Sequence, residues 1–85
     1  MAVIYHKRFI KKSQNLTKKE QQKLTERLKI FGQDESHPLL NNHALKGKYL
    51  GFRSINISGD LRAIYKQQGD SIIFVTIDIH SNLYG

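Results

Sequence analysis

The closing stretch of the chain, from Gly59 to Tyr84, constrains the fold more than any other part of the sequence. Gly69-Asp70 marks a turn within it, and the residues on either side of this turn read as the two strands of a hairpin. Successive side chains of a strand point to opposite faces, so the second strand is predicted to turn one aliphatic face to a core. The residues on that face are Ile73, Val75, Ile77 and Ile79.

The first half of the chain carries the signs of one short strand and two helices. Residues 2–6 are rich in strand formers, and a helical stretch begins near Lys7. Thr17 and Glu20 have the spacing of a capping box, which predicts the start of a second helix. We expect Gly32 to end this helix. Its apolar stripe consists of Leu24, Leu28 and Phe31.

A further strand from Leu50 and the turn Ser58-Gly59-Asp60 lead into the closing hairpin. This order favours an α+β fold of the type β-α-α-β-β-β, with two N-terminal helices on one face of a small, mainly antiparallel sheet. We expect a single domain over residues 1–85. The opposite face of the sheet is then predicted to be an open polar patch, formed by Ser54, Asn56, Arg62, Asp78 and His80.

The composition excludes several classes of protein. Cysteine is absent, which removes disulfides, thiolate metal sites and cysteine nucleophiles and fits a cytoplasmic location. No run approaches the roughly 20 apolar residues of a membrane span, so we expect no membrane partner. The net charge of +7 instead favours an anionic partner such as nucleic acid, with a merely basic surface as the alternative. Four scattered histidines form no zinc pattern, and we expect neither metal nor cofactor.

His80 is the best candidate for acid–base chemistry, because an unperturbed imidazole titrates near neutral pH. Arg62, on the partner strand, is suited to hold a phosphate through two parallel hydrogen bonds and to stabilise charge on phosphorus. Each residue has a structural alternative. His80 is also consistent with a surface histidine at a strand end, and Arg62 with an ion pair to Asp60 or Asp78.

A loop and the C-terminus supply further candidates. Lys46 and Lys48 lie beside a glycine, in a loop suited to grip a backbone phosphate, and His43 adds a second imidazole. Tyr84 is suited to stack on a base. The alternatives are a solvated loop and an aromatic residue that closes the core. The combination of imidazoles, cations and an aromatic ring suits cleavage of RNA without a metal, in which the 2′-hydroxyl attacks the adjacent phosphorus.

The stretch HALKGKYLGFRSINISGDLRAIYK, residues 43–66, and the ending IDIHSNLYG, residues 77–85, resemble the RelE/ParE toxin superfamily. The resemblance is greatest to its YafQ-like branch of RelE-type messenger-RNA interferases. It implies a RelE-like fold and the toxin of a bacterial type II toxin–antitoxin system, a ribosome-dependent endoribonuclease that cuts messenger RNA in the A site. It also implies a cognate antitoxin, small and acidic in its toxin-binding segment, beside the messenger RNA and the ribosome as partners.

The resemblance also assigns residues. By position, the catalytic set comprises His43, Asp60, Arg62, His80 and Tyr84. The residues expected to contact RNA are Lys46, Lys48, Arg53 and Asn56.

The sequence departs from the YafQ-like branch at two positions. Asn56 stands where a histidine is frequent, and Leu61 stands where a tryptophan is frequent. Acid–base work would then rest on His80 and His43, with Arg62 taking more of the electrostatic load. Two alternatives stay open: a ParE-like toxin that inhibits DNA gyrase through protein contacts, and a catalytically inactive relative that acts only by binding.

Overall fold

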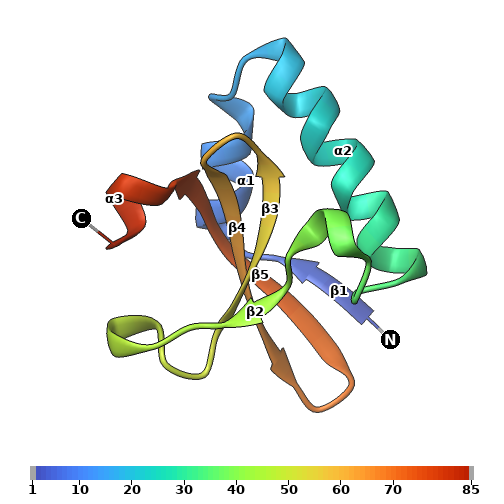
Figure 1. Cartoon of the computed structure of the whole chain (residues 1–85), viewed down its shortest axis with the longest axis vertical. Coiled ribbons are helices and arrows are strands. Elements are labelled where there is room, and N and C mark those ends of the chain that lie inside the picture. Colours follow the sequence, from blue (N-terminus) through green and yellow to red (C-terminus); the bar gives the residue numbers. More distant parts are fainter. Residues whose placement is uncertain (1, 85) are drawn as a thin grey trace.

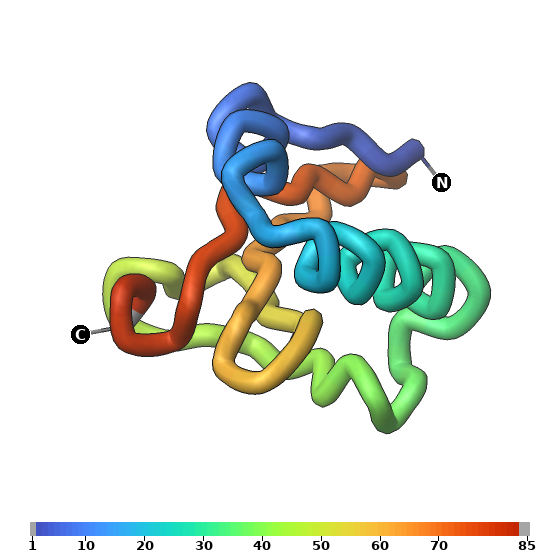
Figure 2. Tube along the Cα trace, turned by 90° about the horizontal axis from the view of Figure 1, so that it is seen from above, coloured from blue at the N-terminus to red at the C-terminus, as the bar shows by residue number. Residues whose placement is uncertain are grey.

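The computed structural model describes residues 2–84, except for the side chain of Tyr84. In chain order the elements are β1 (Ala2–Tyr5), α1 (Lys7–Gln14), α2 (Lys18–Gln33), the 3-10 turn η1 (Pro38–Leu40), β2 (His43–Ala44), the 3-10 turn η2 (Gly47–Tyr49), β3 (Arg53–Ser58), β4 (Leu61–Gln68), β5 (Ser71–Ile79) and α3 (His80–Tyr84). Figures 1 and 2 show β1 and α3 on opposite sides of the molecule. No described helix is long and apolar enough to cross a membrane.

The strands form one mixed sheet in the order β1-β5-β4-β3-β2. β1 pairs with β5 in parallel, and the other neighbours are antiparallel. The predicted α+β fold, with two helices and a mainly antiparallel sheet, is therefore confirmed. The predicted element order omits β2 and α3, because elements of two and five residues are too short to show a hydrophobic period.

The predicted capping box at the start of α2 is present. The Glu20 backbone N–H donates to the Thr17 hydroxyl oxygen at 3.1 Å, and the Thr17 backbone N–H donates to the Glu20 carboxylate at 3.0 Å. The predicted end of the helix at Gly32 is wrong, because the helix continues to Gln33 and is capped by Asp34. Gly32 does not adopt the left-handed backbone that would end the helix there.

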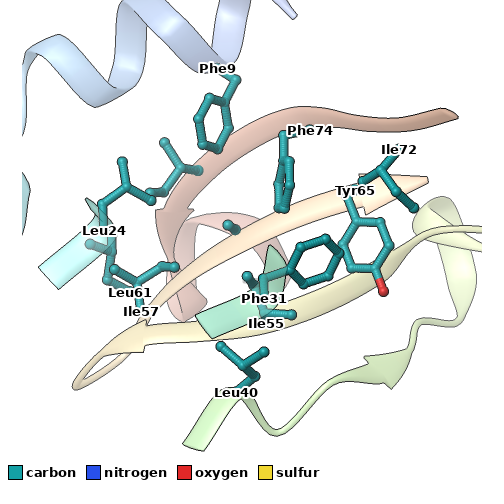
Figure 3. Close-up of a cluster of buried hydrophobic side chains, with 12 residues drawn as sticks. Phe9, Leu24, Phe31, Leu40, Ile55, Ile57, Leu61, Tyr65, Ile72 and Phe74 are labelled. Atoms are coloured by element: carbon teal, nitrogen blue, oxygen red, sulfur yellow. The ribbon is translucent and has the colours of Figure 1, made fainter. Parts of the chain in front are cut away.

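Both helices pack on the same face of the sheet, around the fully buried ring of Phe74 in β5. Phe9 from α1 and Phe31 from α2 approach this ring with centroid distances of 5.5 and 5.4 Å, and Tyr65 from β4 lies at 5.3 Å. Figure 3 shows these four rings gathered between the helices and the strands. Each buried aromatic side chain stabilises the fold by a few kcal/mol, so this cluster holds the helices in place.

The prediction for the core-facing side of β5 is only half right. Ile77 is buried in the helix-side core and Ile79 packs against it, as predicted. Nearer the start of the strand the prediction of Ile73 and Val75 is wrong, because the residue buried there is Phe74. The even-numbered residues therefore face the helices in the first half of the strand, and the odd-numbered residues face them in the second half.

A β-bulge causes this change of phase. Ile64 of β4 pairs with Thr76, but the next residue, Tyr65, pairs with Phe74, so Val75 is an extra residue in β5. One inserted residue moves the side chains before it to the opposite face. Val75 accordingly packs on the other side of the sheet, against the buried cluster that contains Ile64.

The sheet face away from the helices is not the open polar patch predicted. Leu45, Ile64 and Leu83 are buried there as a second apolar cluster, which we call the cap cluster. Ser54 and Thr76 are buried on the same face, and their hydroxyl oxygens have no hydrogen-bond partner among the described residues. Loop 45–52 and α3 thus cover the middle of this face, and only one end of it stays polar and accessible.

Candidate functional site

The polar end of the sheet is built from one cross-strand row. Asn56 of β3 pairs with Arg62 of β4, which in turn pairs with Asp78 of β5. The neighbouring row, which includes Ala63 and Ile77, belongs to the helix-side core. Because adjacent rows point to opposite faces, Asn56 and Arg62 lie on the face away from the helices, as predicted.

The guanidinium of Arg62 is held by the backbone of the β3–β4 turn. Its Nη1 donates to the carbonyl oxygens of Gly59 at 2.7 Å and Leu61 at 3.2 Å. Within the described part of the chain it forms no ion pair with Asp60 or Asp78, so the structural alternative for Arg62 is not observed. Its positive charge is fixed in place, and no carboxylate of residues 2–84 pairs with it.

Asp78 does not form an ion pair with Arg62, because its carboxylate is bonded to other residues. Its carboxylate accepts a hydrogen bond from the Lys12 ammonium of α1 at 2.7 Å, forming an ion pair, and others from Asn82 Nδ2 at 3.0 Å and the Ile79 backbone N–H at 2.8 Å. The hydrogen bond from Lys12 is the main reason that the pKa of Asp78 lies below its ordinary value, with Asn82 and Ile79 acting in the same direction. Lys12 thereby neutralises the one carboxylate in the row.

His80 begins α3, directly after β5, and its side chain is exposed. Its backbone N–H donates to the Asp60 carbonyl oxygen at 2.8 Å, which ties the start of α3 to the turn that also holds Arg62. The structure therefore brings Asp60, Arg62 and His80 to one end of the sheet. His80 does not pack beneath the Leu24 and Phe31 stripe of α2.

The basic loop reaches the same face through the cap cluster. Leu45 packs with Leu83 of α3, and Lys46 and Lys48 follow in the exposed part of loop 45–52. Figures 1 and 2 both show this loop on the same side of the molecule as α3. The Lys48 ammonium lies 5.4 Å from the ring centre of Tyr49, a cation–π contact.

Lys66 is a further cation on this face that the prediction missed. It lies on the same face of β4 as Arg62 and Ile64, at every second position of the strand. Its ammonium lies 5.9 Å from the ring centre of Phe52. The same alternation in the sequence contained the signal for it, since residues at i and i+4 of a strand share a face.

Two predicted site residues, His43 and Arg53, are not brought to this end, and a third, Tyr84, cannot be placed. His43 lies in β2, separated from β5 by two strands and hence by about 14 Å, and its Nδ1 is 2.8 Å from the Asn41 carbonyl oxygen. Arg53 pairs with Tyr65 of the helix-side core, so it points to the other face of the sheet. The side chain of Tyr84 lies outside the described residues.

Chemically, this end of the sheet combines a fixed guanidinium, an exposed imidazole and flexible ammonium groups. Such a set is suited to hold a phosphodiester and to transfer a proton. Among the described residues there is no group of three or more histidine or acidic side chains placed to hold a metal ion.

Comparison with known proteins identifies the family of the chain. The family model described as "Bacterial toxin of type II toxin-antitoxin system, YafQ" matches residues 1–85. The chain belongs to the YafQ family of type II toxins. Membership of this family confirms the predicted resemblance to the RelE superfamily and its YafQ-like branch.

Solved structures share the YafQ-family fold. The crystal structure of YafQ from E. coli strain BL21(DE3) has 22% identity and a TM-score of 0.77, with 98% of this chain and 97% of that chain covered. The YoeB/ParE toxin from Agrobacterium tumefaciens has 16% identity and a TM-score of 0.75, with coverage of 94% and 99%. The E. coli DinJ–YafQ toxin–antitoxin complex matches with 23% identity, a TM-score of 0.74 and coverage of 98% and 96%. A search of curated protein sequences found no significant match.

Proposed function

We propose that this toxin is a ribosome-dependent endoribonuclease that cleaves messenger RNA in the A site without a metal ion. The observation that carries the proposal is the guanidinium of Arg62, fixed by the turn on the same end of the sheet as the exposed His80 and without an ion pair to any carboxylate of the described residues. Ribosome dependence follows from the sequence resemblance to RelE-type interferases.

The reaction needs two proton transfers and stabilisation of charge on phosphorus. The 2′-hydroxyl loses its proton to a base, its oxygen bonds to the adjacent phosphorus, the bond to the 5′-oxygen breaks, and an acid protonates that oxygen. The products are a 2′,3′-cyclic phosphate and a 5′-hydroxyl. Arg62 holds the non-bridging oxygens and stabilises the pentacoordinate phosphorus. His80 carries one of the two proton transfers, as the imidazole nearest in the fold to the Arg62 turn.

The surrounding cations bind the rest of the strand. Lys46, Lys48 and Lys66 border the same face and supply positive charge for backbone phosphates, while Asn56 sits beside Arg62. Arg53 is not part of this surface, because it lies on the opposite face of the sheet.

We further propose that a small antitoxin with an acidic segment inhibits the toxin. The support is the family itself and the DinJ–YafQ complex, in which a protein of this fold is bound to its antitoxin. The net charge of +7 complements an acidic partner.

Primer extension on messenger RNA in a translating extract tests the function. We expect cuts in the A site with the unchanged toxin, and a loss of about 10²-fold or more in rate for His80→Gln and for Arg62→Ala. Lys29→Ala is the matched control, because it removes a cation from the exposed side of α2 and should cut normally. Intact transcripts with inhibited gyrase would indicate a ParE-like toxin, and intact transcripts without growth arrest would indicate an inactive relative.

A further inference from the structure

A second polar site lies on the helix side of the sheet, away from the Arg62–His80 end. It is a cavity of about 460 Å³ between the segment that follows α2 and the β2–β3 edge of the sheet. Its size falls within the range of about 300–1,000 Å³ that is typical of small-molecule sites. The residues that matter here are Glu35, His37, Asn42, Arg53, Tyr65 and Gln67.

The structure holds Arg53 in one orientation over this cavity. Asn42 Oδ1 accepts a hydrogen bond from Arg53 Nε at 2.8 Å. The amide nitrogen of Asn42 donates in turn to the Tyr65 hydroxyl at 2.7 Å and to the Glu35 carbonyl oxygen at 3.0 Å. Tyr65 is only 2% exposed and belongs to the rigid helix-side core, with its hydroxyl pointing out of the apolar cluster (Figure 3). The guanidinium is thus pre-organised by a chain of bonds anchored in the core.

The network leaves several donors unused at the cavity. Arg53 keeps both of its Nη groups, which have no partner within the described part of the chain. The Tyr65 hydroxyl accepts from Asn42 and retains its own proton to donate. His37 accepts the Leu39 backbone N–H at its Nδ1, so in the neutral ring Nε2 carries the proton and is a donor. Glu35 adds the one negative charge in the lining.

We propose that this cavity binds a single nucleotide unit, with its phosphate on Arg53 and its base toward His37 and Glu35. A bidentate guanidinium matches a phosphate, and an imidazole ring is suited to stack on a base. Glu35 would oppose a bare anion, but it can accept a hydrogen bond from the exocyclic amino group of a base. Arg53 and Glu35 together therefore favour adenine or cytosine nucleotides, whose bases carry an exocyclic amino group, over uridine nucleotides, whose base does not.

This site is independent of the proposed cleavage reaction. Arg53 pairs with Tyr65 in a row that faces the helices, whereas Arg62 pairs with Asn56 in a row that faces the opposite side. A nucleotide at Arg53 is thus separated from His80 by the thickness of the sheet. The ligand is either a free nucleotide or one residue of an RNA strand, since both present the same phosphate and base.

Titrations of the 85-residue chain, followed by amide NMR shifts, test the proposal. With AMP, CMP, UMP and inorganic phosphate as probes, we expect saturable shifts at Asn42, Arg53 and Gln67. AMP and CMP should bind more tightly than UMP, and phosphate alone more weakly. Arg53→Ala should weaken AMP binding about tenfold or more, and Arg53→Lys, which keeps the charge but not the fork, should also weaken it. Glu35→Gln should reduce the preference for AMP over UMP.

His80→Gln is the matched control and should bind AMP as the unchanged protein does. A 5′-phosphorylated oligoribonucleotide that shifts the same amides at lower concentration identifies an RNA strand as the ligand, and AMP alone identifies a free nucleotide. The proposal is overturned by an absence of saturable shifts at millimolar AMP, by equal shifts in folded Arg53→Lys, or by loss of binding in His80→Gln. None of these outcomes depends on whether messenger RNA is cleaved.

Discussion

The ion pair between Lys12 and Asp78 connects α1 to the strand that leads into α3, and it makes a sharp prediction for Lys12→Met. The substitution keeps most of the side-chain length but removes the 2.7 Å charge-assisted hydrogen bond to Asp78. Asp78 then keeps only its bonds to Asn82 and to the Ile79 backbone N–H. We expect the protein to become less stable and the start of α3 to become less firmly held.

The exposure of the two side chains determines how much stability the substitution removes. Buried hydrogen bonds to charged groups contribute about 1.5–3 kcal/mol, whereas exposed ion pairs contribute about 0–1 kcal/mol. The side chains of Lys12 and Asp78 are 33% and 26% exposed, between these limits. A loss of about 1 kcal/mol follows, which lowers the Tm of a domain of this size by about 4–8 °C.

The lowered pKa of Asp78 also predicts how the effect of Lys12→Met on stability changes with pH. The pKa of Asp78 is lowered in the folded protein, chiefly by Lys12, below the ordinary value of 3.8. Its stabilising contribution is therefore present above pH 3.8 and is lost as the pH falls through the lowered folded-state pKa. The difference in Tm between Lys12→Met and the unchanged protein should accordingly have its full size at pH 7 and become smaller in strong acid.

Thermal unfolding followed by circular dichroism, at pH 7 and at several values below 3.8, measures both effects. Lys11→Met is the matched control, because Lys11 is exposed in the same turn of α1 and forms no ion pair within the described part of the chain. Equal Tm values for the two variants at pH 7, or a difference that stays constant in acid, would refute the reasoning.

Three further predictions concern the start of α2 and the proposed RNA-binding face of the sheet. Thr17→Ala removes the capping box and should cost about 1 kcal/mol in the free energy of unfolding, measured in urea; an unchanged midpoint would contradict the role of the cap. Asn56→His adds an imidazole beside Arg62 and should raise the cleavage rate at neutral pH about tenfold or more in the translating extract, whereas an unchanged rate would show that proton transfer there is not limiting. RNA affinity should fall steeply with salt, and Lys46→Ala should reduce the slope of log K against log salt by about 0.7; a flat response would count against phosphate contacts by Lys46.

The helices and turns were predictable because their signals are local. The Thr17–Glu20 capping box depends on a spacing of three residues, and the structure contains both of its hydrogen bonds. The hairpin turns place Gly59 and Gly69 at φ values of 46° and 59°, a region that glycine enters at little cost. The strand predicted over residues 2–6 is present as β1, although it ends at Tyr5 and His6 caps α1. Nothing local shows that β1 pairs in parallel with β5.

The packing of β5 was not predictable from alternation alone. The bulge at Val75 depends on how β5 meets β4, and it exchanges the faces of the residues before it. The cap cluster was missed for a related reason, since Leu45 and Leu83 are 38 positions apart and meet only when α3 folds back over the sheet.

The candidate site was predicted where it depended on one strand pair. Arg62 and Asn56 share a face because they are cross-strand neighbours, and their grouping could be inferred from the hairpin. The contribution of Lys12 could not, because 66 positions separate it from Asp78. Arg53 is one residue out of phase with the polar face, and its alternation alone already placed it on the other side.

The nature of the cut tests the central claim most directly. A messenger RNA carrying a single 2′-deoxynucleotide on the 5′ side of the mapped cleavage position should resist the toxin in the translating extract, while the all-ribose transcript is cut to leave a 2′,3′-cyclic phosphate. Both results follow from the proposed mechanism, in which the 2′-oxygen attacks a phosphorus held by Arg62. Efficient cleavage of the 2′-deoxy transcript at the same position would contradict the account.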